Sequence, residues 1–219
     1  MNDLSIAQEY LICAVNPKGK ISGFNTERLV CLVASCLLEL QLENCIKIDK
    51  KYITVTDRLP QNKMYLKPLY DFLNQPKPVK IEKILETYTY SVTDKNLNEL
   101  ISSIGTSLKD LGLVKTAITG IFKNKTAYMP SEKAIHFVVD MVRAEFFEDV
   151  EITEDIAALV ILLDKSNVIK TYFSEYERKE IKKKLKEAAN SETGKLIESM
   201  IEYIENMISI MTVLHVFYS

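Results

Sequence analysis

The spacing of apolar residues predicts a chain that is mainly α-helical. Apolar positions recur every three or four residues through most of the sequence, which is the period of one helix face. Ser, Thr or Asp stands where several of these stretches begin, and such residues cap helix N-termini. We therefore expect helices at residues 4–15, 27–42, 62–74, 78–90, 94–111, 131–147, 154–165, 175–189 and 192–215.

The second of these helices is apolar nearly all the way round. Thr26 is placed to cap it, and the sequence from Arg28 to Leu42 reads RLVCLVASCLLELQL. A helix without a polar face has to be covered on every side. We therefore expect this helix to lie buried at the centre of the fold.

Two short β-hairpins interrupt the helical pattern. The first pairs Ile46–Ile48 with Tyr52–Val55 around a turn at Asp49-Lys50-Lys51, and the second is LVKTAITGIFKNKTAYMP, residues 113–130. No linker-like stretch divides the chain. The predicted fold is therefore mainly α, a single compact helical domain over residues 1–219 with a buried central helix and two short β-hairpins.

The first hairpin follows a helix, as the wing of a winged-helix protein does. Lys50 and Lys51 at its tip would suit contact with DNA. However, such a protein also needs a polar, basic recognition helix, and the helix that leads into this hairpin is apolar. We expect this hairpin to close the core, and we keep a winged-helix-like nucleic-acid-binding regulator as the alternative function.

The charge balance and the ends of the sequence limit the classes of function and the cellular location that we expect. Lys and Arg number 28 against 30 Asp and Glu, so the net charge of −2 argues against a dedicated nucleic-acid binder. The N-terminus carries Asp3 and Glu9 where a signal peptide would be apolar, and the uncharged run at residues 206–219 is too short to span a bilayer. We expect a cytoplasmic protein, with peripheral membrane association left open.

Motifs of catalysis and of metal binding are missing from the sequence. The cysteines at 13, 31, 36 and 45 form no CxxC pair and are expected to be buried thiols. His136 and Asp140 would share a helix face, which we interpret as an ordinary half-exposed pair. Residues 175–188 mix both charge signs at helical spacing and are interpreted as a solvated face. We therefore expect a protein that is not an enzyme, without cofactor or metal.

Several strings, taken in order, resemble the Golgi phosphoprotein 3-like family. They are LSIAQEYLICAVNPKGKISGFN, LLELQLENCIKI, ITVTDRLPQNKMYLKPLYDFLNQPKPVKIEKILE, LKDLGLV with the hairpin after it, and DIAALVILLDKSNVIKTYFS. The likeness covers nearly the whole chain, and it rests on the succession of strings. It implies a non-enzymatic, mostly helical protein of a phosphoinositide-binding family that docks on a membrane surface.

The resemblance also implies where a lipid head group would bind. Eukaryotic members of the family hold phosphatidylinositol 4-phosphate with a Trp and several Arg, and these positions fall on Phe24, Val33, Asn98 and Ile101. Arg28 is a nearby cation that replaces them only in part. Because a phosphate dianion needs several converging donors, we expect this pocket to be degenerate.

The second hairpin is either the working surface of the protein or part of its core, with both faces covered by the helices at 131–147 and 192–215. Both of its faces carry apolar residues, and its tip is cationic. Such a strip suits an anionic membrane surface or a protein partner, and a homo-oligomer through residues 115–130 is a further alternative. The residues assigned to this surface are Ile118, Ile121, Phe122, Lys123 and Lys125.

Overall fold

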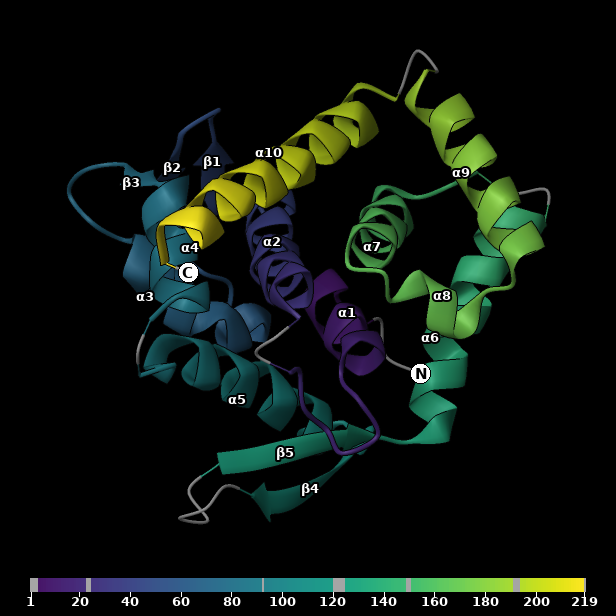
Figure 1. Ribbon diagram of the computed structural model, residues 1–219, viewed down its shortest axis with the longest axis horizontal. Helices are drawn as coiled ribbons and strands as arrows, with labels where there is room; N and C mark the ends of the chain where they lie inside the picture. The colour runs from purple at the N-terminus through teal and green to yellow at the C-terminus, as the bar shows by residue number, and fades with distance from the viewer. Residues whose placement is uncertain are drawn as a thin grey trace.

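The computed structural model describes residues 4–22, 25–91, 93–119, 125–148, 151–190 and 194–218 (Figure 1). More than half of these residues are helical, which confirms the predicted fold class. In chain order the elements are α1 (Ile6–Ala14), α2 (Thr26–Leu42), β1 (Ile46–Ile48), β2 (Tyr52–Val55), the 3₁₀ helix η1 (Gln61–Leu66), α3 (Lys67–Leu73), β3 (Val79–Lys80), α4 (Ile81–Thr89), α5 (Lys95–Asp110), β4 (Val114–Thr119), β5 (Lys125–Pro130), α6 (Glu132–Phe147), α7 (Glu154–Lys165), α8 (Ile169–Tyr172), α9 (Glu175–Ala189) and α10 (Lys195–Tyr218).

Helix α2 lies at the centre of the fold, and its burial confirms the prediction from its apolar sequence. Helices α1, α4, α7 and α10 pack against it (Figure 1). Every residue from Leu29 to Leu40 is buried. The Ser35 hydroxyl in this stretch donates to the Leu32 carbonyl at 2.7 Å, so its burial leaves no unsatisfied donor there. The predicted N-cap is wrong by one residue, because Asn25 and not Thr26 holds that position.

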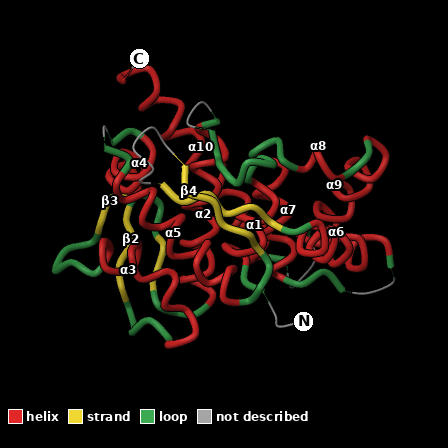
Figure 2. The backbone as a smooth tube through the Cα atoms, turned by 90° about the horizontal axis from the view of Figure 1, so that it is seen from below, coloured by secondary structure: helices red, strands yellow, loops and turns green. Residues whose placement is uncertain are grey.

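Helix α10 covers α2 on the side away from the second hairpin. It crosses α2 and contacts α4, α7 and α9 along its length (Figure 1). Figure 2, seen from below, shows β4 and β5 on the near side of the molecule and α10 on the far side. The molecule therefore has two separate outer surfaces, one formed by the hairpin and one formed by α10.

The helix boundaries follow the predicted caps in most places. The hydroxyls of Ser131, Thr153 and Ser174 accept from the first turns of α6, α7 and α9, and Ser174 forms a reciprocal capping box with Glu177. Asp94 precedes α5 but makes no capping bond, because its backbone is left-handed with φ of +47°. The last helix was predicted to begin at residue 192, which lies outside the described residues, and α10 begins at Lys195.

The predicted helices at 62–74 and 78–90 are wrong in part. Residues 61–66 form the 3₁₀ helix η1, and α3 begins only at Lys67, with Pro68 in its first turn, where proline is tolerated. Val79 and Lys80 pair with β2 as a third strand before α4 begins at Ile81. The four-residue helix α8 was missed because so short a stretch has no periodic pattern.

Two small antiparallel sheets carry the predicted hairpins. In the first, with order β1-β2-β3, Ile46 faces Val55 and Ile48 faces Ile53, and Ile46 and Ile53 are buried in the core. This hairpin therefore closes the core, as predicted. In the second sheet β4 pairs with β5 in a register that runs from Val114 opposite Pro130 to Thr119 opposite Lys125.

The interior is apolar and contains the cysteines as free thiols. Cys13, Cys31, Cys36 and Cys45 are all buried and unpaired, as predicted. Burial raises the pKa of Cys31 to about 12 and also raises the pKa values of Cys13 and Cys36. Within the described ranges, none of the helices combines the length and apolarity needed to cross a bilayer.

Candidate functional site

The inner end of the β4–β5 hairpin is fixed to the helical body by Tyr128. Its ring packs on Gly105 of α5, where a Cβ would lie only 2.4 Å from the ring. The Tyr128 hydroxyl lies 3.3 Å from both the Ser102 carbonyl and the Thr106 hydroxyl. Glycine at position 105 therefore allows the close approach that attaches the hairpin to α5.

A turn at residues 16–19, closed by a 2.8 Å bond from the Gly19 N–H to the Asn16 carbonyl, holds the same strand. The Tyr128 backbone N–H donates to the Gly19 carbonyl at 3.2 Å, and Gly19 has φ of +69°. A Cβ at Gly19 would lie 2.7 Å from the Tyr128 backbone, so both the conformation and the space require glycine. The turn and the hairpin therefore form one connected surface, although more than 100 residues separate them in the chain.

Beyond this attachment the hairpin exposes one large apolar side chain and also exposes lysines. Ile118 of β4 is 72% exposed. The neighbouring lysines of the hairpin and of the Gly19 turn are exposed as well. We call this surface the hairpin face and define it as Lys18, Lys20, Lys115, Ile118 and Lys125.

An acidic residue just before α5, Asp94, lies close to this surface. Lys125 Nζ lies 3.8 Å from an Asp94 carboxylate oxygen, and both side chains are about half exposed. Exposed pairs of this length contribute little and are weakened by salt. The hairpin face therefore keeps a positive character. The remaining predicted hairpin residues, Ile121, Phe122 and Lys123, lie outside the described residues.

Arg28, the cation that the sequence offered for the head-group pocket, has a structural role. Its Nη1 donates to the Ala14 carbonyl at 3.1 Å, which is the last residue of α1. The Arg28 carbonyl in turn accepts from the Tyr10 hydroxyl at 3.1 Å. Arg28 therefore links α1 to the start of α2, and only part of its guanidinium remains available to a ligand.

The other predicted pocket residues do not form a cationic site. Val33 has no exposed surface, so no ligand can reach it in this fold. Asn98 and Ile101 lie half-buried on α5 and carry no charge. Phe24 lies outside the described residues.

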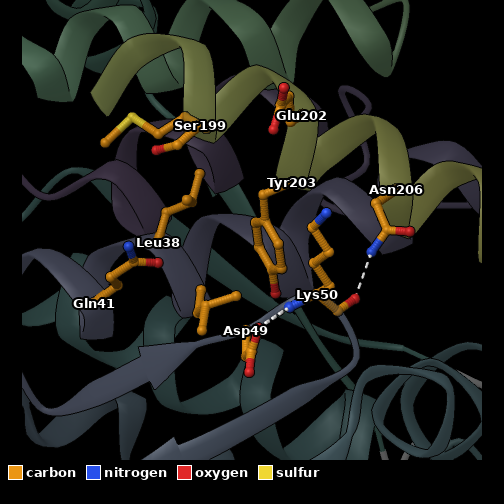
Figure 3. A pocket seen from close by; sticks show the side chains of 10 residues that line it. Leu38, Gln41, Asp49, Lys50, Ser199, Glu202, Tyr203 and Asn206 are labelled. Atoms are coloured by element: carbon orange, nitrogen blue, oxygen red, sulfur yellow. Dashed lines mark hydrogen bonds between the residues drawn. The ribbon is translucent and has the colours of Figure 1, made fainter. Parts of the chain in front are cut away.

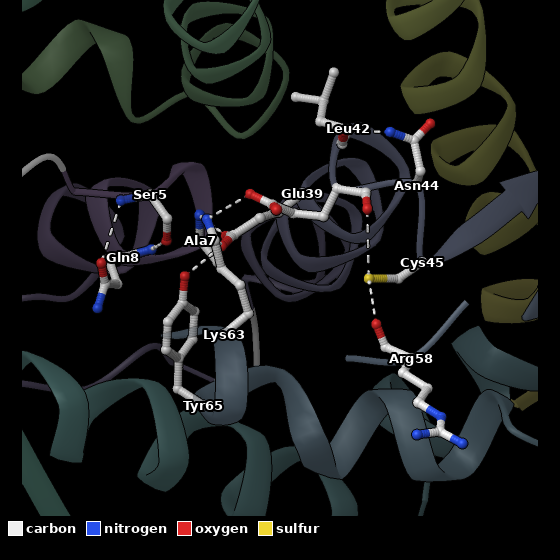
Figure 4. A network of polar contacts seen from close by, with 11 residues as sticks. Ser5, Ala7, Gln8, Glu39, Leu42, Asn44, Cys45, Arg58, Lys63 and Tyr65 are labelled. Carbon is white, nitrogen blue, oxygen red and sulfur yellow. Dashed lines mark hydrogen bonds and ion pairs between the residues drawn. The ribbon is translucent and has the colours of Figure 1, made fainter. Parts of the chain in front are cut away.

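A buried polar cluster around Glu39 was missed by the sequence analysis (Figure 4). Glu39 of α2 is 3% exposed, and its carboxylate accepts from Lys63 Nζ at 3.0 Å, from the Ala7 N–H at 3.2 Å and from the Tyr65 hydroxyl. Ala7 lies in the first turn of α1, where the helix dipole favours an anion. The signal in the sequence was a single carboxylate inside an otherwise apolar helix.

The charges in this cluster stabilise one another. Burial lowers the pKa of Lys63, but the charge and the hydrogen bond of Glu39 outweigh that effect and leave the pKa raised. Lys63 also pairs with Glu43 at 3.0 Å. Because the Glu39 carboxylate is already held by three protein donors, we assign this cluster a structural role, the joining of α1, α2 and η1.

The helix pair His136 and Asp140 does not form a ligand set. Both side chains are exposed, and Asp140 pairs with Arg143 at 3.5 Å. No group of His, Cys, Asp or Glu suited to a metal ion occurs in the part of the chain that the structure describes.

Comparison with known proteins bears on the family of the chain. A search of curated proteins finds no match to the chain. A family model described as Golgi phosphoprotein 3 (GPP34) matches residues 6–204, which run from the first residue of α1 into α10. Because the match covers most of the chain, the protein belongs to the Golgi phosphoprotein 3 (GPP34) family.

Proposed function

We propose that this protein is a non-enzymatic adaptor that associates peripherally with anionic membranes through the hairpin face. The observation that carries the proposal is the 72% exposure of Ile118 on a hairpin that, together with the turn attached to it, also exposes four lysines. An apolar side chain can enter the interfacial region of a bilayer while lysines contact anionic head groups. Membership of the Golgi phosphoprotein 3 family supports the same function.

The sizes of the electrostatic contributions favour weak, salt-dependent binding to the membrane. Each lysine near an anionic surface contributes about 1 kcal/mol. Lys125 contributes less than the others because Asp94 lies beside it. This attraction is screened over about 10 Å at 0.1 M salt, so binding should decrease as the salt concentration rises.

Selective binding of phosphatidylinositol 4-phosphate is not part of the proposed function. Val33 is buried, Asn98 and Ile101 are uncharged, and Arg28 is bonded to the Ala14 carbonyl. A phosphate dianion would find too few donors at these positions to offset the cost of its desolvation. We therefore propose that bulk negative charge, and not one head group, determines which membranes are bound.

The test is co-sedimentation with vesicles. Vesicles of phosphatidylserine and phosphatidylcholine should retain the protein at low salt, and vesicles of phosphatidylcholine alone should not. Ile118→Ser should reduce retention several-fold without lowering thermal stability, because Ile118 is exposed. The matched control is Val213→Ser, which removes an exposed apolar side chain on α10 and should change nothing.

Two results would overturn the proposal. Equal retention of the Ile118 variant and the native protein would show that the hairpin face is not the contact. Saturable binding to phosphatidylinositol 4-phosphate that persists at high salt would show that the head-group pocket is intact.

Self-association through the same hairpin is the second candidate. Large exposed apolar side chains commonly mark protein contacts, and Ile118 fits that description. Sedimentation velocity of the native protein and the Ile118 variant distinguishes the two functions. The nucleic-acid alternative has little structural support, because α2, the helix before the first hairpin, is buried where a recognition helix would be exposed.

A further inference from the structure

A cavity of about 450 Å³ opens between α10, α2 and the β1–β2 turn, away from the hairpin face. Its apolar wall consists of Leu38 of α2, Ile48 of β1 and Met200 of α10. The volume lies in the range of small-molecule sites, which combine apolar walls with a few placed polar groups. The charged and polar side chains around this wall therefore determine which class of molecule the cavity suits.

Two carboxylates line the cavity with acceptor capacity to spare. Asp49 comes from the β1–β2 turn and Glu202 from α10, and in Figure 3 they lie below and above the ring of Tyr203. Neither carboxylate forms an ion pair with any residue that the structure describes. The Asp49 carboxylate accepts from the Lys50 N–H at 2.7 Å, which uses one of about four lone-pair positions. A ligand that donates hydrogen bonds would therefore find free acceptors here.

Tyr203 adds an aromatic face and a further acceptor. The residue is 9% exposed, and its hydroxyl has no hydrogen-bond partner among the described residues. In Figure 3 the ring points from α10 toward the turn, so the hydroxyl can donate to the Asp49 carboxylate beside it and keep its lone pairs for a ligand. The face of a tyrosine ring also attracts cations, because its quadrupole is negative there.

The charge of the cavity is negative on balance. Among the described residues that line it, Lys50 is the one cation, and it belongs to none of the ion pairs. Two carboxylates and one ammonium leave a net charge of −1. An anion would be repelled, whereas a single positive charge would be attracted. A second positive charge on the same ligand would find the cavity already neutral, so a monovalent cation fits best.

The turn that carries Asp49 is already held in place. Asn206 Nδ2 of α10 donates to the Lys50 carbonyl at 3.1 Å, and the Asp49 N–H donates to the Tyr52 carbonyl at 2.8 Å. These bonds attach the turn to α10 and to β2. A preformed site binds without the entropic cost of ordering its parts, so a small ligand is enough to occupy it.

We propose that this cavity binds a small amphipathic monoamine. The ammonium group would donate to the Asp49 carboxylate and the Tyr203 hydroxyl oxygen, with the Glu202 carboxylate as a second counter-charge. The hydrocarbon chain would contact the apolar wall. Charge-assisted hydrogen bonds are the strong ones, and the wall removes apolar area from water. No residue of the hairpin face lines the cavity, so this binding is separate from membrane docking.

Isothermal titration calorimetry with octylammonium tests the proposal, with octanoate as the probe of opposite charge. Octylammonium should bind saturably, with one molecule per chain, and octanoate should not bind. Asp49→Asn and Glu202→Gln should each lower the affinity for octylammonium about fivefold, a modest factor because both carboxylates are exposed. Asparagine at position 49 keeps an acceptor for the Lys50 N–H, so the turn should stay intact.

Lys50→Gln gives the sharpest result, because a cation site and an anion site predict opposite effects. The substitution removes the cation that competes with the ligand for the two carboxylates. The affinity for octylammonium should therefore rise about fivefold. A general loss of structure would lower the affinity and could not produce this increase.

Two matched controls make the same changes of charge outside the cavity. Lys51→Gln changes the next residue, which lines a different groove, and should leave octylammonium binding unchanged. Glu205→Gln changes another carboxylate of α10, which pairs with Lys165 and does not line the cavity, and should also leave the affinity unchanged. All the substituted side chains are exposed, so thermal unfolding should show little change in Tm.

Three results would overturn the proposal. They are the absence of saturable octylammonium binding to the native protein, binding of octanoate as tight as that of octylammonium, and an affinity for octylammonium that is unchanged or lowered in Lys50→Gln. Unchanged affinity in both carboxylate variants would equally show that the ammonium group does not bind at this cavity.

Discussion

Glu39→Ala should destabilise the protein more than any exposed charge substitution. The substitution removes the acceptor of Lys63 Nζ, of the Ala7 N–H and of the Tyr65 hydroxyl from a site that is 3% exposed. Removing one partner from a buried ion pair costs about 3–5 kcal/mol, because a charge is left buried and unpaired.

For Glu39→Ala we expect a cost at the lower end of the range of about 3–5 kcal/mol. Lys63 retains its second partner, Glu43, at 3.0 Å, so its charge is not left fully unpaired. The Ala7 N–H in the first turn of α1 and the Tyr65 hydroxyl each lose an acceptor. We therefore expect a loss of about 3 kcal/mol in the free energy of unfolding, or a fall of roughly 6–12 °C in Tm for a chain of this size.

Urea and thermal unfolding, followed by far-UV circular dichroism, measure both quantities. The matched control is Asp71→Ala, which breaks the Lys67–Asp71 pair, whose side chains are 52% and 53% exposed. Exposed pairs contribute at most about 1 kcal/mol. If Glu39→Ala costs no more than Asp71→Ala, the structural role assigned to the cluster is wrong.

Two further predictions concern titrating groups. Because burial raises the pKa values of the four thiols, they should not react with a disulfide reagent at pH 8 in the folded protein; they are Cys13, Cys31, Cys36 and Cys45. All four should react once the protein is unfolded in urea. Fast reaction of the native protein would contradict this prediction. The backbone N–H of Ser174 and the Arg143 guanidinium hold the pKa of Glu177 below its ordinary value near 4.5, so this carboxylate adds stability that is fully present above that pH and is lost as the pH falls through the lowered pKa. The difference in Tm between the native protein and Glu177→Gln should therefore be constant at neutral pH and shrink in acid, and a difference that grows in acid would refute the assignment.

The parts of the fold that sequence alone predicted depend on local pattern. The apolar stretch of α2 requires burial whatever surrounds it, and the Ser174 capping box depends on residues three apart. β3 escaped prediction because Val79 and Lys80 form a strand only by pairing with β2. A two-residue strand between a proline and a helix has no periodic signal of its own.

The candidate sites were harder to predict because they depend on contacts between distant segments. Sequence offered Arg28 as a cation that partly replaces the missing Arg of the pocket, but its bond to the Ala14 carbonyl depends on how α1 meets α2. The role of Glu39 depends on the positions of Lys63 and Ala7, which lie on other elements. In each case the residue type was visible in the sequence, and the partner, or its absence, was not.

Contacts between distant segments also determine how the hairpin face should bind a membrane. Because Tyr128 bonds to the Gly19 carbonyl and packs on Gly105, the turn with Lys18 and Lys20 is attached to the strand pair that carries Ile118. The apolar group and these two lysines therefore belong to one preformed surface and need not be ordered when they meet a membrane. A preformed surface binds without the entropic cost of assembling its parts, so a few lysines and one isoleucine can produce measurable association. Losing the Gly19 contact should consequently weaken docking even though every charge and every apolar group remained present.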